Sequence, residues 1–410
     1  MAELSEFGEV VLLVAAAFGV AVVTHKLTDW VAVPAPGIFL VAAAVASDVF
    51  PQLADALSTR GVERVAVVAL VLILFDGGMR VGWRRFRAAA APVTLLGVAG
   101  TFATAALLAA AGRLLFGFDW TMAWILGAAL APTDPAVMFS VLGRREIGGR
   151  TAIILEGESG ANDPVGIALM IGILDFATHE HASLWTIARE FTTQMAVGVA
   201  VGIAAGLVLV PLLRRVHLPN VALYPLRTLA AAGVVYGLAS VAHGSGFLAV
   251  FVAALVLGDS RMPQKAAIGR FHTSLASLGE IVVFVALGLT VDVTNLSRQS
   301  VWLHGLVLAV ILALLARPLV AGGLLLPTRL RWGERLFVMW AGLKGAVPIL
   351  LAAFALLADV DGSEQIYGIV FVVVAFSVVL QGVTIPSAAR RLGVPIRLLQ
   401  DRDAVEPDGP

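Results

Sequence analysis

The sequence has no cysteine and few charged residues. Only 14% of its 410 residues are Asp, Glu, Lys or Arg, compared with about 25% in a typical soluble domain. The 28 basic and 28 acidic residues cancel, which excludes a nucleic-acid-binding protein that works by bulk charge. The absence of cysteine excludes thiol catalysis and cysteine-ligated metals. Together these features exclude a soluble globular enzyme, a disordered chain and a disulfide scaffold.

Long hydrophobic runs dominate what is present. Hydrophobic residues make up 59% of the chain, and its mean hydropathy is +0.94. A helix needs about 20 apolar residues to cross the hydrocarbon core, and about thirteen stretches predict an all-α polytopic membrane protein. Their approximate limits are 7–25, 31–49, 62–79, 90–112, 121–142, 151–174, 191–213, 221–241, 246–258, 276–291, 301–326, 334–357 and 366–386. Glu3, Glu6 and Glu9 replace the basic region of a cleavable signal, so none is expected.

The basic residues are unevenly distributed among the loops. If the N-terminus lies outside, the inside segments carry most of the Lys and Arg, at 26, 80–87, 144–150, 214–215, 261–270, 329–335 and 390–402. The outside loops carry only Arg60, Arg64, Arg113, Arg189 and Arg298. Cytoplasmic loops are the basic ones in membrane proteins. The bias predicts a cell (inner or plasma) membrane protein with its N-terminus outside, an odd number of spans and a cytoplasmic C-terminus.

Two of the spans are interrupted at comparable places. The fifth contains Ala-Pro-Thr-Asp-Pro at 131–135, and the twelfth contains Gly-Leu-Lys-Gly-Ala-Val-Pro at 342–348. Proline and glycine weaken a helix, and lipid does not satisfy the freed backbone groups, so each break marks an internal site. The breaks are seven spans apart, and an odd offset reverses the direction of a helix. We therefore expect two inverted six-helix repeats, spans 1–6 and 8–13, as in secondary transporters.

Six ionisable side chains stand out within or near the spans: Asp76, Asp134, Glu158, Asp163, Arg317 and Lys344. A charge at bilayer depth costs at least about 2.5–3.5 kcal/mol, so each needs a partner or a function. Low-dielectric surroundings disfavour a charged carboxylate, so Asp163 can bind a proton or a small cation in competition. Asp163, Thr133 and Ser159, with carbonyls freed at the break, are the candidate ligands of a monovalent cation. A single titrating carboxylate predicts one proton per cation, which is electroneutral exchange.

The other charged residues suggest pairings. Arg317 stays charged in the eleventh span, so it needs a partner, and Glu158 is the candidate for a buried ion pair. The amide of Asn162 can tie the sixth span to the broken fifth without adding a titratable charge. Asp134 is expected to point at the opposing half-helix or at the cation. Lys344 is expected to neutralise the helix C-terminal ends at the second break.

Asp76 has two interpretations. It lies near the inner end of the third span, in the segment Phe-Asp-Gly-Gly-Met-Arg at 75–80. It is either an accessory residue of the ion site or an interfacial acid that pairs with Arg80. The sequence alone leaves both open.

Three motifs carry a resemblance to a known family. Residues 157–163, with Gly157, Glu158, Ser159, Asn162 and Asp163, resemble the pattern GES..ND. Residues 133–137 resemble TDP.AV, and residues 342–348 resemble GLRGAVP. Over about residues 8–390 the chain is similar to the monovalent cation/proton antiporters of the NhaP and sodium–proton exchanger type. The motif variants look most like the potassium/proton branch.

The resemblance implies an NhaA/NhaP-like fold of thirteen helices. Residues 1–390 would form the transmembrane antiporter domain, and 391–410 a short cytosolic tail. A core of about 90–174 and 301–386 would move like an elevator against a dimerisation domain of about 7–79 and 191–291. The site residues implied by the motifs are Asp163 as the cation- and proton-binding carboxylate, Asn162, Ser159, Thr133 and Asp134 around it, Glu158 with Arg317 as a structural pair, and Asp76 in place of a frequent glutamate.

The implied function is secondary active antiport of K⁺ or Na⁺ against H⁺ by alternating access, serving pH homeostasis. The resemblance implies a homodimer in the lipid bilayer, without cofactor, enzymatic activity or nucleic-acid partner. Na⁺ and K⁺ take the same oxygen ligands, so spacing does not distinguish them. Two departures from the family are visible. Lys344 replaces the usual arginine, which keeps the charge but loses the bidentate fork. Members of the potassium branch often carry a cytosolic regulatory domain, and this sequence is expected to be either a short member without it or a piece of a longer protein.

Two other classes of protein fit part of the sequence. Gly-Glu-Ser-Gly at 157–160 and Ala-His-Gly-Ser-Gly at 242–246 resemble motifs of rhomboid-like intramembrane serine proteases, with Ser159 and His243 as a catalytic dyad. This interpretation leaves the two breaks and Arg317 unexplained. A channel is the second alternative, and it predicts currents far above the turnover of an exchanger.

Overall fold

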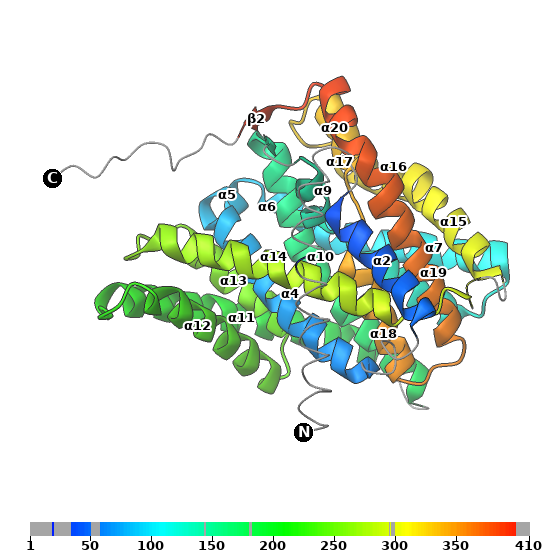
Figure 1. The fold of residues 1–410 in the computed structure, drawn as a ribbon, viewed down its shortest axis with the longest axis horizontal. Coiled ribbons are helices and arrows are strands. Elements are labelled where there is room, and N and C mark those ends of the chain that lie inside the picture. Colours follow the sequence, from blue (N-terminus) through cyan, green and yellow to red (C-terminus); the bar gives the residue numbers. More distant parts are fainter. Residues whose placement is uncertain are drawn as a thin grey trace.

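The computed structural model describes residues 34–50, 58–142, 145–179, 183–294 and 300–398, together with residues 19 and 296. The described chain is almost entirely helical (Figure 1). Its first elements are α2 (Ala35–Val49), α4 (Thr59–Val81), α5 (Trp83–Ala88), α6 (Ala90–Thr94), η1 (Leu95–Gly100), α7 (Thr101–Phe116), α8 (Trp120–Leu130), α9 (Pro135–Leu142), β1 (Arg145–Ile147), α10 (Gly149–Thr178) and α11 (Leu184–Arg215). The labels η1, η3 and η4 denote π-helical segments.

The second part of the chain continues the same architecture. Its elements are α12 (Leu223–Val241), α13 (Gly246–Gly258), α14 (Lys265–Leu289), α15 (Val301–Ile311), η3 (Leu312–Ala316), α16 (Arg317–Leu324), α17 (Trp332–Trp340), α18 (Ala346–Leu357), α19 (Ser363–Ala375), η4 (Phe376–Gln381), α20 (Gly382–Arg391) and β2 (Ile396–Leu398). The predicted spans from the second to the thirteenth each coincide with one helix or a run of consecutive segments. The first span, 7–25, and the end of the tail, 399–410, lie outside the described residues.

One boundary differs clearly from the prediction. The tenth span was expected at 276–291, but α14 begins at Lys265. Its first turns are too polar to be recognised as apolar sequence. They make side-chain hydrogen bonds: the Nζ of Lys265 donates to the nearby carbonyl of Ser260 at 3.1 Å, and the hydroxyl of Thr273 donates to Asp76 on α4.

Six helical stretches in the described part of the chain are long and apolar enough to cross a membrane: 90–116, 149–178, 185–215, 265–289, 301–324 and 363–391. Four shorter apolar helices are α2, α8, α13 and α18. Two pairs of consecutive helices, α8 with α9 and α17 with α18, each form one interrupted crossing rather than two spans. The fold is therefore that of a polytopic helical membrane protein.

The interruptions follow from the local sequence. Pro135 begins α9, where its missing N–H costs nothing, and the segment 131–134 before it is non-helical. Gly345 precedes α18 with φ of −120° and ψ of −142°, outside the helical region. The π-helical segments η1 and η3 lie in the fourth and eleventh spans, which are also seven spans apart. Both pairs of features agree with inverted repeats.

The helices gather around α10. In Figure 1, α11, α12 and α13 lie on one side of the molecule, and α7, α15, α16 and α19 lie on the other. A short antiparallel pairing of β1 with β2 joins the loop after α9 to the segment after α20. This pairing places the loop between the fifth and sixth spans on the same side as the end of the thirteenth.

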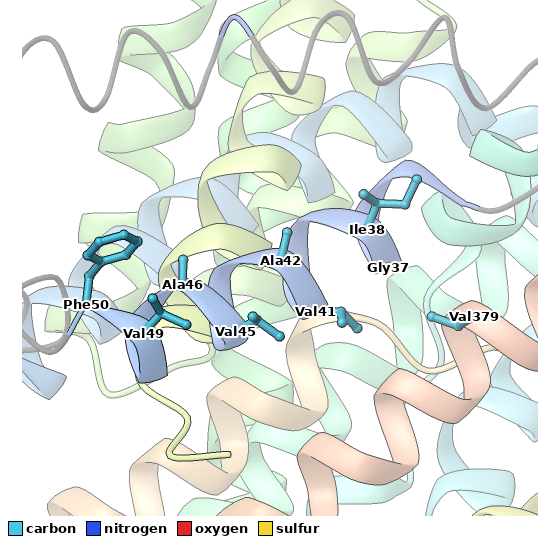
Figure 2. A pocket seen from close by; sticks show the side chains of 9 residues that line it. All are labelled: Gly37, Ile38, Val41, Ala42, Val45, Ala46, Val49, Phe50 and Val379. Carbon is cyan, nitrogen blue, oxygen red and sulfur yellow. The ribbon is translucent and has the colours of Figure 1, made fainter. Parts of the chain in front are cut away.

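An apolar groove follows the exposed face of α2. Figure 2 shows Ile38, Val41, Val45 and Phe50 along this helix, with Val379 beside it. The groove encloses about 600 Å³ and is open to its surroundings. Among the described residues, the lining holds no charged side chain and none of the predicted site residues. The ion site has to be sought elsewhere.

Candidate ion-binding site

One face of α10 carries three of the predicted site residues. Ser159, Asn162 and Asp163 stand three and four residues apart, which aligns them on one side of the helix. All three are buried, with exposed fractions of 4%, 2% and 4%. Pro164 follows within the helix, so the carbonyl of Gly160 receives no helical hydrogen bond from position 164. The middle of α10 thus combines buried polar side chains with weakened backbone pairing.

These side chains contact the break between α8 and α9. The hydroxyl of Ser159 donates to the backbone carbonyl of Thr133 at 2.7 Å. The Nδ2 of Asn162 donates to the Oγ1 of Thr133, also at 2.7 Å. Thr133 is itself buried. The structure therefore brings together four of the predicted residues, Thr133, Ser159, Asn162 and Asp163, from the fifth and sixth spans.

Two side-chain oxygens of α10, on the helix face that carries the site residues, have no hydrogen-bond donor among the described residues. They are Oδ1 of Asn162 and Oδ1 of Asp163, and both are fully buried. Buried polar atoms are almost always paired, so each exception needs an explanation. Two adjacent acceptors without a donor are what a bound cation or a carboxyl proton would satisfy.

The two breaks are joined by hydrogen bonds. The N–H of Asp134 donates to the carbonyl of Leu343 at 2.8 Å. The Nζ of the buried Lys344 donates to the carbonyls of Ala131 and Pro132, each at 2.8 Å. These carbonyls end α8, and a cation is favourable at a helix C-terminus. The sequence predicted that Lys344 neutralises helix ends at the second break, whereas in the structure its ammonium contacts the helix end at the first break.

Asp134, in the first break, contacts the second break with its side chain. Its carboxylate packs so closely on Gly345 that a Cβ at this glycine would overlap it. Gly345 precedes the first turn of α18, and a helix N-terminus favours a negative charge. Of the two expectations for Asp134, the opposing half-helix is the one with a contact in the structure. The same proximity explains why position 345 has no side chain.

Arg317 and Glu158 form a buried ion pair. The Nη1 and Nη2 of Arg317 donate to the two carboxylate oxygens of Glu158, the second at 2.8 Å. Nη2 also reaches the carbonyl of Val338 at 3.3 Å in α17. A Cβ at Gly342 would overlap the guanidinium. The pair therefore links α10, α16 and the second break, so that its loss would loosen the support of the ion site.

The sequence reasoning missed a hydrogen-bonded support for the second break. The hydroxyl of Ser377 accepts from the N–H of Lys344 at 2.9 Å and donates to Oε1 of Gln381 at 3.2 Å. The Nε2 of Gln381 donates to the carbonyl of Trp340, at the end of α17. Two buried polar side chains in the otherwise apolar thirteenth span were the available signal.

Asp76 lies away from these contacts, at the end of α4. It pairs with Arg80 at 2.6 Å and accepts from the hydroxyl of Thr273 at 3.1 Å. The pairing with Arg80 matches the second of the two interpretations given above.

The sequence reasoning also missed Glu280 of α14, which has a buried Oε1 without a hydrogen-bond donor among the described residues. Its signal was an acid inside the predicted span 276–291.

Paired broken helices around buried carboxylates define a class, that of ion-coupled secondary transporters. A family model described as sodium/hydrogen exchanger, transmembrane, matches residues 12–391. The chain belongs to this family of transporters. The serine protease alternative is not supported: Ser159 donates to Thr133, while His243 is exposed at the end of α12.

Curated relatives extend the comparison. The chain is 39% identical over 330 residues to the K(+)/H(+) antiporter NhaP of Alkalimonas amylolytica, covering 80% of this chain and 57% of the relative. It is 32% identical over 380 residues to the K(+)/H(+) antiporter NhaP2 of Shewanella oneidensis, covering 90% and 65%. It is 27% identical over 348 residues to the Na(+)/H(+) antiporter ApNhaP of Aphanothece halophytica, covering 81% and 65%. The chain thus spans less than two thirds of the length of these relatives.

A solved structure has the same fold. The sodium proton antiporter MjNhaP1 from Methanocaldococcus jannaschii matches with a TM-score of 0.77 at 21% identity, covering 94% of this chain and 98% of that one. The described architecture, with its broken crossings, is therefore the antiporter fold that the motifs predicted.

Proposed function

We propose that this chain exchanges a monovalent cation for a proton across a membrane. The observation that carries the proposal is the buried Oδ1 of Asp163, beside a broken helix, which has no hydrogen-bond donor among the described residues. The names of the relatives, K(+)/H(+) and Na(+)/H(+) antiporters, support the same reaction. We favour K⁺ because the relatives that are 39% and 32% identical are both named as K(+)/H(+) antiporters.

In this proposal a cation and a proton compete for Asp163. When its carboxylate is charged, the Oδ1 atoms of Asp163 and Asn162 attract a cation, and the hydroxyl oxygens of Ser159 and Thr133 complete the ligands with backbone carbonyls. When the carboxylate is protonated, its charge is gone and the cation leaves. Glu158 and Arg317 neutralise each other and Lys344 is held by carbonyls. One charge therefore alternates between proton and cation, with no resident cofactor.

We infer that the core, 90–174 and 301–386, carries this site against the scaffold, 7–79 and 191–291. The contacts between the breaks and α10, α16 and η4 lie inside the core, so the site can move as one unit. We further propose a homodimer in the cell membrane with a cytoplasmic C-terminus. The resemblance to the family and the distribution of basic residues support these assignments.

Purified protein in liposomes tests the proposal. With a pH-sensitive dye inside, we expect K⁺ or Na⁺ to drive proton flux that saturates, and choline to drive none. On solid-supported membranes the same cation should produce no transient current, because one proton is exchanged for one cation. A current that accompanies the flux would contradict the one-to-one exchange, and a large unsaturable current would indicate a channel.

A further inference from the structure

Glu280 has a buried carboxylate oxygen that the proposed exchange does not use. It lies 15 residues into α14, about 22 Å from the start of the helix at the rise of 1.5 Å per residue. Its Oε1 is fully buried without a donor among the described residues, while the residue as a whole is partly exposed. The charged groups that act on it are Asp134 at the first break and Arg80 on α4. Its helix, α14, packs against both α4 and α18, the helix that follows the second break.

Glu280 continues a polar stripe on α14. Thr273, Ser277 and Glu280 stand four and three residues apart, so they share one side of the helix. The two hydroxyl residues are exposed and Glu280 is partly so, whereas Phe284, which is next along this side, is buried. Ionisable residues within a membrane helix face the bundle interior or a water-filled cavity. The stripe thus ends at the depth where the apolar core begins.

A small cavity opens at the other end of the stripe. It holds about 100 Å³ and is lined by α4, α14 and the segment between α13 and α14, with Asp76, Arg80, Lys265 and Thr273 among its residues. Thr273 joins the cavity to the stripe, and its hydroxyl contacts both Asp76 and Arg80. Polar groups therefore extend from this cavity along α14 to Glu280, and from there to the charge of Asp134.

We propose that Glu280 is a second cation-binding carboxylate, at which a monovalent cation pauses on a wet path between the Asp76–Arg80 cavity and Asp163. This role rests on the proposed exchange, because only a transported cation needs the path. Asp76 is paired with Arg80, whereas Oε1 of Glu280 has no partner among the described residues, so Glu280 is the carboxylate of the stripe that can take up a cation. A cation held there is drawn toward the ion site before it reaches Asp163.

The absence of cysteine allows a direct test that does not depend on transport. In the full chain, Ser277→Cys in membrane vesicles of both orientations should react with two water-soluble thiol reagents, a cationic trimethylammonium-ethyl and an anionic sulfonatoethyl methanethiosulfonate. Adding Glu280→Gln should lower the ratio of cationic to anionic rates about threefold or more, because one nearby charge is removed. The control Val282→Cys, exposed on the opposite side of α14, should react slowly with both.

The labelling has clear contrary outcomes. If Ser277→Cys reacts no faster than Val282→Cys, the stripe is not wet. If the ratio of rates is unchanged by Glu280→Gln, no cation is attracted there. Either result overturns the proposal. Should wild-type protein show no cation-driven proton flux, the proposed exchange fails, and the labelling still decides whether a wet, cation-attracting path exists.

Flux measurements distinguish cation binding by Glu280 from a purely structural role of this residue. In liposomes, Glu280→Gln should raise the cation concentration for half-maximal rate about threefold or more, and Glu280→Asp should restore most of the affinity. A purely structural role would instead lower the melting temperature and the maximal rate while leaving the half-saturating concentration unchanged. That pattern would overturn the assignment.

Discussion

Replacing Asp163 by Asn should abolish cation-driven proton flux while leaving the protein folded. The side chain keeps its shape, but the amide carries no charge and titrates no proton, so neither substrate of the exchange is bound. We expect the flux in liposomes to fall to that of protein-free vesicles. The melting temperature should stay near that of the wild type, because Oδ1 of Asp163 accepts no hydrogen bond from the described residues.

A matched control lies on the same helix. Asp175 is three turns further along α10, where it pairs with His179 at 2.9 Å. Asp175→Asn removes an identical charge away from the breaks and should leave the flux intact. Retained flux in Asp163→Asn would refute the site, whereas equal losses in both variants would indicate a general effect of charge on α10.

The second large effect concerns stability. Arg317→Ala should lower the melting temperature in detergent strongly, because it strands the buried carboxylate of Glu158. Removing one partner of a buried ion pair costs about 3–5 kcal/mol. The variant also loses the contact to the carbonyl of Val338 near the second break. Exchange should therefore fall together with the amount of folded protein.

A double variant separates the charge from the packing. Glu158→Leu combined with Arg317→Met removes both charges and keeps apolar volume, and such replacements are often neutral or stabilising. We expect it to recover most of the melting temperature lost in Arg317→Ala. An unchanged melting temperature in Arg317→Ala itself would mean that the pair contributes nothing to stability.

Several features could be predicted because they depend on residues that lie close together in the sequence. The clusters of proline and glycine at 131–135 and 342–348 predict breaks in their helices, and the structure interrupts both crossings there. The predicted bounds of the ninth span, 246–258, are those of α13. An arginine inside an apolar span needs a partner, and Glu158, which is also flanked by apolar residues, was the candidate that the structure pairs with Arg317.

Other features depend on packing, which spacing does not contain. Which helix end Lys344 contacts is decided by how the two breaks cross, and the structure places it on the carbonyls of Ala131 and Pro132. The support from Ser377 and Gln381 requires η4 to lie beside the second break. The start of α14 at Lys265 escaped prediction because its first turns are polar, and the contact of Thr273 with Asp76 on α4 is not visible in the sequence.

Proton release on cation binding tests the central claim, competition at Asp163, most directly. Purified protein in weakly buffered detergent would receive K⁺ or Na⁺ while a pH dye reports free protons, with choline as the control for ionic strength. We predict the release of up to about one proton per chain in the wild type, saturating with cation, and none in Asp163→Asn. Cation binding without proton release, or equal release in Asp163→Asn, would contradict the account.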